Sequence, residues 1–384
     1  MTKQKDRLYL FLFLIVFING FEAGGYQASL YSIGQTYDLS VTNMGIFASV
    51  ELLATMLAPL LLGNWADRTG KIKSMIILLS VQTAFSAAVF MSRLEPVFLI
   101  GIFFLGLTTS ALQFIAIAAL ADSYPVSGKK KIGFLTSMYA LGALVSPLVV
   151  SFYLDRGIDW RMLFLSITAG TLIAISGLFI TRNEKREEAA ISSEEEKNGR
   201  TFILAGVLFL CVVMCIYVGF ENGFAFFVDT MFTDVLKSSL GKYALSLFWA
   251  VMIPSRILVG YLSKHAKKIL LSSVIAIPVI TCILSQLSSD IAVFLLCIPL
   301  GFACGAIYPS VLTTVLHFTG SRTATATGMI TVSTGLGGVI FTALTGIMAD
   351  ALGMRGAMIA LSSFFILSIG AVVATICLIR KKGL

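Results

Sequence analysis

The chain has 384 residues, of which 57% are apolar and 12% are charged. An ordinary soluble domain has roughly 45–50% apolar and 25% charged residues, so this composition excludes a soluble globular protein and indicates a surface that faces lipid. The formal net charge is +8, but the basic residues lie between apolar stretches rather than on one face, which predicts no nucleic-acid partner.

Long apolar stretches run through the whole sequence. Each is close to the roughly 20 residues that a helix needs to cross a hydrocarbon core of about 30 Å. Continuous apolarity, rather than alternation, favours helices over a β-barrel. The sequence therefore predicts an all-α integral membrane protein with twelve transmembrane helices. Their approximate ranges are 8–34, 42–64, 72–92, 96–121, 132–154, 162–181, 202–228, 241–262, 269–287, 290–318, 323–349 and 356–379.

The first apolar stretch follows Lys3, Lys5 and Arg7, as the apolar core of a secretory signal peptide follows its basic residues. The stretch is too long for a signal peptide, and no A-x-A-like cleavage site follows it. We expect it to be retained as a helix.

The first stretch also carries an acid, Glu22, in the sequence GFEAG between Gly20 and Gly24. A carboxylate inside a bilayer costs about 2.5–3.5 kcal/mol on insertion scales, so it normally faces a helix bundle or a wet cavity. Asn19 and Tyr26 lie at i−3 and i+4, on the same helical face. We interpret Glu22 as a candidate for proton coupling and its two neighbours as candidate substrate ligands. The alternative is an acid that only hydrogen-bonds between helices.

Polar side chains recur inside the following stretches. Glu51 in the second stretch is a further candidate for proton coupling. Gln113 in the fourth and Tyr139 in the fifth could bind the hydroxyl groups of a solute, although such groups also tie helices together. We expect both to be substrate ligands.

The only long polar interruption spans residues 182–200 and reads RNEKREEAAISSEEEKNGR. Its six glutamates are mixed with basic residues, which is typical of a solvated tether. The sequence therefore predicts an N-terminal bundle of six helices over 1–181, a cytoplasmic linker over 182–201 and a second six-helix bundle over 202–384.

The seventh stretch repeats the pattern of the first. Glu221 stands in GFENG, 199 residues after Glu22, and Tyr217 lies one turn before it at i−4. Glu221 is a second candidate for proton coupling, and Tyr217 and Asn222 are candidate substrate ligands. The segments that start at residues 63 and 260 have a similar spacing of 197 residues. Such spacing predicts two parallel six-helix repeats, with a solute site near the membrane midplane where they meet.

Later stretches add two more candidate substrate ligands, Trp249 in the eighth and Tyr308 in the tenth. Arg256 lies about one turn before the end of the eighth stretch, so we interpret it as a side chain that extends to the membrane surface. All six cysteines fall within apolar stretches, where we expect them to be small buried side chains. Because the chain has only two histidines, we predict no metal site.

The basic residues are distributed unevenly across the predicted membrane. With twelve crossings, 21 of the 28 lysines and arginines fall on the side of the two termini. The positive-inside rule then places both termini in the cytoplasm of a multi-pass protein of the plasma or inner membrane.

Residues 63–73, GNWADRTGKIK, resemble the G-x-x-x-D-R-x-G-R/K-K/R signature of the loop between helices 2 and 3 in the major facilitator superfamily. The resemblance implies two pseudo-symmetric six-helix bundles. It also implies that Asp67, next to Arg68, packs against a helix end of the other half and helps to lock the outward-facing state. Gly63 and Gly70 would permit close approach of the two halves and a tight turn of the loop. In the second half Lys264 occupies the position that corresponds to Asp67, so the resemblance does not imply an equivalent contact there.

A narrower resemblance favours one branch of that superfamily. Residues 217–223, YVGFENG, are similar to the Y-V-G-x-E stretch of helix 7 in the fucose, galactose and glucose permeases. Residues 246–249, SLFW, and 255–260, SRILVG, resemble the S-x-F-W and G-R-x-x-x-G runs of their helix 8. Tyr308-Pro309 and Gly337-Gly338 also fit.

The sequence thus predicts a secondary active transporter, not an enzyme, that imports a neutral hydroxylated solute such as a monosaccharide by proton-coupled alternating access. The alternative is a proton-coupled antiporter that exports drugs or a metabolite, because residues 142–147, GALVSP, resemble the G-x-x-x-G-P antiporter core. No nucleotide-binding motif occurs, so the expected energy source is a proton gradient, with sodium as the other option. The expected partners are a small solute and the lipid bilayer, and the expected state is a monomer without cofactors.

Overall fold

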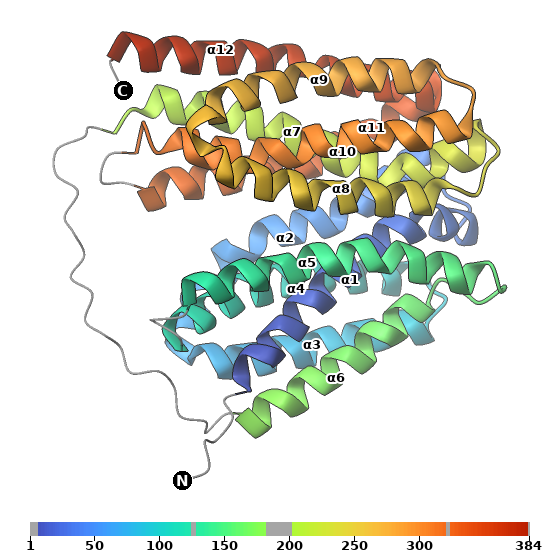
Figure 1. The fold of residues 1–384 in the computed structure, drawn as a ribbon. Coiled ribbons are helices and arrows are strands. Elements are labelled where there is room, and N and C mark those ends of the chain that lie inside the picture. Colours follow the sequence, from blue (N-terminus) through green and yellow to red (C-terminus); the bar gives the residue numbers. More distant parts are fainter. Residues whose placement is uncertain (1–6, 124–127, 182–201, 320–322, 383–384) are drawn as a thin grey trace. The chain divides into compact units, whose positions relative to one another are not determined.

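The computed structural model describes residues 7–123, 128–181, 202–319 and 323–382. Within these ranges the chain is helical, with short connections and no strands (Figure 1). The helices of the first half are α1 Leu8–Thr36, α2 Val41–Thr69, α3 Lys71–Met91, α4 Glu95–Ser123, α5 Gly128–Leu154 and α6 Met162–Thr181. Those of the second half are α7 Leu204–Thr230, η1 Met231–Val235, α8 Gly241–Tyr261, η2 Ser263–His265, α9 Ala266–Gln286, α10 Asp290–Val315, α11 Thr323–Ser363 and α12 Phe365–Lys382. The predicted linker 182–201 lies outside the described residues.

Each of the first ten predicted stretches coincides with one helix, which confirms the prediction of helices for these apolar stretches. The described residues contain eleven segments that are long and apolar enough to cross a membrane. The last of them runs from Gly328 to Lys382, which at 55 residues is more than twice the length of one crossing. Gly353 interrupts its helical backbone with φ 71° and ψ 162°.

The connection between α2 and α3 is shorter than the sequence motif predicts. Residues 63–69 continue the helix instead of forming a loop, and the turn is made by Gly70 alone, at φ 90° and ψ 132°. This left-handed conformation favours glycine, because a Cβ atom would be strained there.

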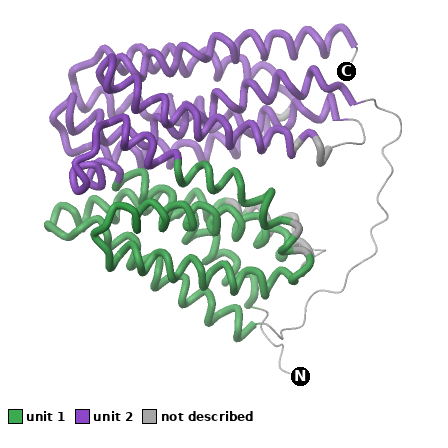
Figure 2. Tube along the Cα trace, turned by 180° about the vertical axis from the view of Figure 1, so that it is seen from behind, with its two compact units in different colours: residues 1–29, 50–193 green, residues 30–49, 194–384 purple. Residues whose placement is uncertain are grey.

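The helices form two compact units (Figure 2). The first comprises residues 1–29 and 50–193, and within it α3 packs against α4 and α6, and α4 packs against α5. The second comprises residues 30–49 and 194–384, and within it α7 packs against α11 and α12, while α10 packs against α8 and α9.

Residues 30–49 belong to the second unit because they bond to its helices. The Tyr31 hydroxyl donates to Asp234 Oδ1 over 2.8 Å, and the backbone N–H of Thr42 donates to Asp350 Oδ2 over 2.8 Å. The Asp350 carboxylate therefore lies at the N-terminus of α2, where a negative charge is stabilised by the helix dipole.

The glycines that flank Glu22 and Glu221 allow close contacts between helices. In the first unit, a Cβ atom at Gly20 or Gly24 would overlap the backbone of α5 at Tyr139 or Ala143. In the second unit, a Cβ atom at Gly219 would overlap Phe341 of α11, and one at Gly223 would overlap Thr345. The equivalent glycines thus pack α1 on α5 and α7 on α11, as expected for two copies of one repeat.

This packing predicts a stability difference between two glycine substitutions. Gly20→Ala inserts a methyl group into the α5 backbone and is expected to cost about 1–3 kcal/mol, because overpacking a well-filled interior forces the helices apart. Gly370→Ala in α12 meets no atom within 4 Å and is the matched control. Thermal unfolding of both variants in detergent tests the prediction, and an unfolding temperature for Gly20→Ala equal to that of Gly370→Ala contradicts it.

Candidate functional site

The first unit contains a buried polar network centred on Thr109 of α4. Its hydroxyl donates to Glu22 Oε2 of α1 over 3.4 Å and accepts from Gln82 Nε2 of α3 over 3.1 Å. Its carbonyl oxygen accepts from Asn19 Nδ2 over 3.0 Å. Glu22, Asn19 and Gln82 are each 0% exposed. Three helices of one unit therefore meet at a site made of one acid and neutral hydrogen-bonding groups.

A second acid lies close to this network. Glu51 of α2 is 4% exposed and lies near Glu22, and the buried Tyr26 of α1 lies near both carboxyl groups. Gly106 of α4 allows this arrangement, since a Cβ atom there would meet the Glu51 backbone oxygen at 2.5 Å. Two carboxyl groups that approach each other in a dry interior cannot both carry a charge without a large cost.

The network has more acceptors than donors. Among the described residues, Glu22 Oε1, Asn19 Oδ1 and Gln82 Oε1 are buried and have no hydrogen-bond partner. No basic side chain in the described ranges forms an ion pair with Glu22 or Glu51. A buried acceptor without a partner is costly, and a protonated carboxyl group supplies a donor that an ionised one lacks.

The second acid of the repeat is surrounded differently. Arg256 Nη2 of α8 lies 3.6 Å from Glu221 Oε1 of α7, with the Glu221 side chain 10% exposed and the Arg256 side chain 39% exposed. The interpretation of Arg256 as a side chain that extends to the membrane surface did not include this charge partner. A carboxylate of α7 therefore lies within reach of the guanidinium group, and the resulting ion pair is only partly buried.

Aromatic hydroxyls and a thiol surround this ion pair. Tyr217, buried one turn before Glu221, lies beside both charged groups. Cys304 and Tyr308 of α10 lie near Arg256. The structure thus places the predicted site residues Tyr217, Glu221 and Tyr308 in one cluster of the second unit.

Other candidate substrate ligands have different surroundings. Asn222 donates through Nδ2 to the Val218 carbonyl of its own helix over 2.9 Å. Trp249 is 8% exposed and packs edge-on against Phe248 at a ring distance of 6.0 Å. Gln113, half-buried, lies one turn beyond Thr109 on α4, and Tyr139 is half-buried on α5.

The residues of the predicted conformational gate lie at the α2–α3 connection. Arg68 is exposed and Gly63 is half-buried within α2. The side chain of Asp67 lies outside the described residues, so its predicted contact stays a prediction. Three of the six cysteines, Cys211, Cys297 and Cys304, are buried as expected, whereas Cys215 and Cys282 are half-buried and Cys377 is exposed.

Three residues of these clusters, Thr109, Gln82 and Arg256, are not among the site residues that the sequence predicts. The polar run Thr108-Thr109-Ser110 inside the apolar fourth stretch is a signal that could have identified Thr109. The residues around an arginine in the sequence do not show whether it pairs with an acid on another helix or extends to the membrane surface.

Membrane-length helices with buried charged groups between them, as the described residues show, are typical of integral membrane proteins that move ions or solutes. The sequence model of the Major Facilitator Superfamily matches residues 12–342, and the chain belongs to this family of membrane transporters. It is a transporter of small-molecule solutes in a lipid bilayer, not an enzyme.

Two kinds of relative agree with this assignment. The glucose/mannose transporter GlcP of Bacillus subtilis (strain 168) is 22% identical over 327 residues, which cover 81% of this chain and 79% of GlcP. A crystal structure of a bacterial homolog of the human lysosomal transporter Spinster, inward-facing and occupied, matches with a TM-score of 0.83 at 14% identity. That match covers 98% of this chain and 97% of the other. The crystal structure of a D-xylose-proton symporter matches with a TM-score of 0.77 at 14% identity, covering 96% of each chain.

Proposed function

We propose that this transporter imports a neutral, hydroxylated solute such as a monosaccharide together with protons. The observation that carries the proposal is the environment of Glu22. It is fully buried, it is bonded to neutral groups, and its network contains surplus acceptors. One proton on Glu22 removes the buried charge and supplies a donor to the network at the same time.

The comparisons support the sugar class. One relative carries the name of a glucose/mannose transporter, and one structural neighbour is a D-xylose-proton symporter. Besides Glu51, Arg256 and Cys304, the side chains near Glu22 and Glu221 are amides, hydroxyls and aromatic rings, which are suited to hydroxyl groups and to the apolar faces of a sugar ring.

The two acids of the repeat take different roles in this proposal. Glu221 has Arg256 as a charge partner, so its ionised form is balanced within the second unit. Glu22 has no such partner in the described chain and shares its surroundings with Glu51. Glu22, with Glu51 beside it, is therefore the proposed proton site of the first unit, and Tyr217, Glu221 and Arg256 form a proposed solute-binding cluster of the second unit.

We also propose twelve crossings with both termini on the cytoplasmic side of the cell membrane. A segment of 55 residues is too long for a single membrane crossing. The break at Gly353 divides it into two helices, each long enough to cross the membrane once. An even number of crossings agrees with the strong excess of basic residues on the side of the termini. In this arrangement Asp67 and Gly70 lie at the cytoplasmic side, as the gate motif requires.

The proposal is tested with the purified protein in sealed vesicles that contain no other transporter. D-Glucose, D-mannose and D-xylose are offered with an imposed pH gradient, acidic outside, and with a sodium gradient of equal size. We expect accumulation of at least one sugar that depends on the pH gradient and is abolished by a protonophore. Accumulation driven only by the sodium gradient would show that the coupling ion is sodium and not the proton. Gradient-driven extrusion of dyes without sugar uptake would favour the alternative function, a proton-coupled antiporter.

A further inference from the structure

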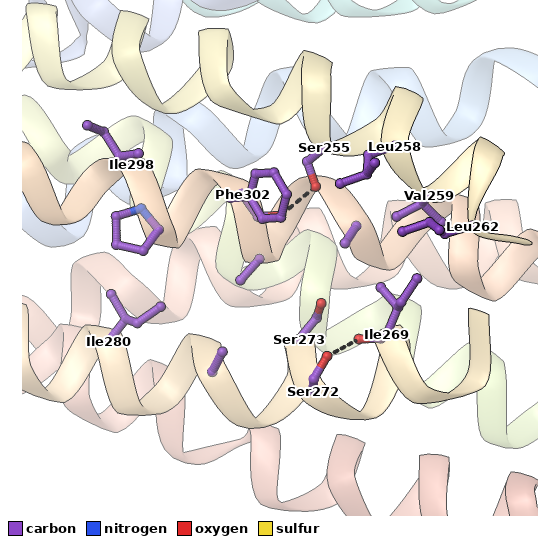
Figure 3. Close-up of a pocket in the computed structure, with 14 residues that line it drawn as sticks. Ser255, Leu258, Val259, Leu262, Ile269, Ser272, Ser273, Ile280, Ile298 and Phe302 are labelled. Carbon is purple, nitrogen blue, oxygen red and sulfur yellow. Dashed lines mark hydrogen bonds between the residues drawn. The ribbon is translucent and has the colours of Figure 1, made fainter. Parts of the chain in front are cut away.

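An apolar groove lies between α8, α9 and α10, within the second unit (Figure 3). Its volume is about 570 Å³, within the roughly 300–1,000 Å³ of typical ligand pockets. Leu258 and Val259 of α8 and Leu262 just after it face Ile269 of α9 at one end of the groove, and Ile280 of α9 lies near Ile298 of α10 at the other end (Figure 3).

The few polar groups in the groove wall are not all available to a solute. Ser255 donates to the Phe302 carbonyl over 2.6 Å, and Ser272 donates to the Ile269 carbonyl over 2.9 Å. Apart from these two residues and Ser273, every lining side chain is apolar. A sugar in this groove would lose its hydrogen bonds to water without replacement, whereas a hydrocarbon chain would not.

The groove has the length of one lipid leaflet. Its lining on α9 runs from Ile269 to Ile280, and eleven residues of helix rise roughly 16 Å. Half of a hydrocarbon core of about 30 Å is close to this value. The groove is therefore long enough for an acyl chain that spans about the hydrocarbon thickness of one leaflet.

Three lysines gather at one end of this groove. Lys264, Lys267 and Lys268 lie next to the lining residues Leu262 and Ile269, where α8 ends and α9 begins. Lys264 and Lys268 are exposed and Lys267 is half-buried. The sequence from residue 257 to 289 contains no aspartate or glutamate, so no acid in this stretch neutralises them.

We propose that the groove binds an anionic phospholipid. One acyl chain lies along α9 between α8 and α10, and the phosphate of the headgroup is held by the three lysines. Basic clusters between transmembrane helices at the membrane surface attract anionic headgroups in this way. None of the residues that line the groove is among the solute-binding or proton-coupling candidates of the proposed function, and the proposed ligand is a component of the membrane.

The proposal is tested by native mass spectrometry of the full-length purified protein. Phosphatidylglycerol and phosphatidylcholine with identical acyl chains are offered at equal concentration. We expect phosphatidylglycerol to be retained about tenfold more, because each lysine near an anionic headgroup adds to the attraction. Equal retention of the two lipids overturns the proposal.

Two sets of variants separate the headgroup contact from the acyl-chain contact. Lys264→Gln/Lys267→Gln/Lys268→Gln is expected to remove the preference for phosphatidylglycerol, whereas Arg380→Gln/Lys381→Gln/Lys382→Gln at the end of α12 keeps it. Ser272→Trp, at an exposed lining position, is expected to reduce retention of phosphatidylglycerol, whereas Val279→Trp on the same helix, outside the lining, is not. Loss of binding in the control variants to the same extent as in the groove variants contradicts the site.

A measurement on the unmodified protein does not depend on how the variants fold. Phosphatidylglycerol with a photoreactive group in its acyl chain is irradiated with the protein, and the labelled peptides are identified. We expect labels in α8, α9 and α10 that unlabelled phosphatidylglycerol competes away. Labels confined to other helices overturn the proposal.

Discussion

Glu22→Gln is expected to abolish uptake against a concentration gradient and to leave exchange of solute intact. Glutamine has the shape of a protonated glutamate and cannot release a proton, so solute movement is no longer linked to the pH gradient. The amide also supplies a donor to the Thr109 network, so the fold is preserved. Uptake into vesicles under an imposed pH gradient is expected to stop at equal concentrations inside and outside. Counterflow of labelled solute, which needs no net proton movement, is expected to continue.

The matched control is Glu95→Gln, which makes the same chemical change at an exposed position at the start of α4. It is expected to accumulate solute like the unmodified protein. If Glu22→Gln also retains pH-driven accumulation, Glu22 is not the coupling group. The same measurement on Glu51→Gln then decides whether its buried neighbour takes that role.

Removing one member of the Glu221–Arg256 pair is expected to destabilise the protein more than removing both. Glu221→Gln leaves the guanidinium without its counter-charge, and Arg256→Gln leaves a carboxylate in the interior of α7. Loss of one partner from a fully buried pair costs about 3–5 kcal/mol. Because Arg256 is partly exposed, we expect roughly 1–3 kcal/mol for each single variant. The double variant Glu221→Gln/Arg256→Gln is expected to recover part of that loss.

Thermal unfolding of the four proteins in detergent gives the interaction energy from the double-mutant cycle, and a value of about 1 kcal/mol or more is expected. Arg380→Gln, at the exposed end of α12, serves as the control for loss of a positive charge. Additive effects of the two single variants would show that the groups do not stabilise each other. Glu221 would then lose the partner that distinguishes it from Glu22 in the proposed mechanism.

The two acids show how a sequence repeat can produce unequal sites. GFEAG and GFENG place Glu22 and Glu221 at equivalent positions, and in both cases the flanking glycines pack against the fifth helix of the repeat. The groups that reach each carboxylate come from other helices and are not repeated. Thr109 of α4 reaches Glu22 and Arg256 of α8 reaches Glu221, so one acid has a neutral partner and the other a cationic one.

The sequence alone determined that the chain is built from membrane helices and where most of them lie. Lipid cannot hydrogen-bond to the backbone, so each apolar stretch of about 20 residues has to satisfy its own polar groups as a helix. This requirement is local, which explains why ten predicted stretches coincide with ten helices. The exact ends were less predictable, as the helical residues 63–69 show, because a polar sequence at a membrane surface is compatible with helix or loop.

The tertiary structure alone decided which buried charges are paired. Asn19 and Tyr26 could be placed beside Glu22 from helical spacing, but Thr109 lies 87 residues away in sequence and Arg256 lies 35 residues after Glu221. Whether such groups meet depends on how the helices pack and rotate, which no single helix specifies. The distinction between an acid with a neutral hydrogen-bond partner and one paired with an arginine therefore arises from packing between helices and not from the repeated sequence.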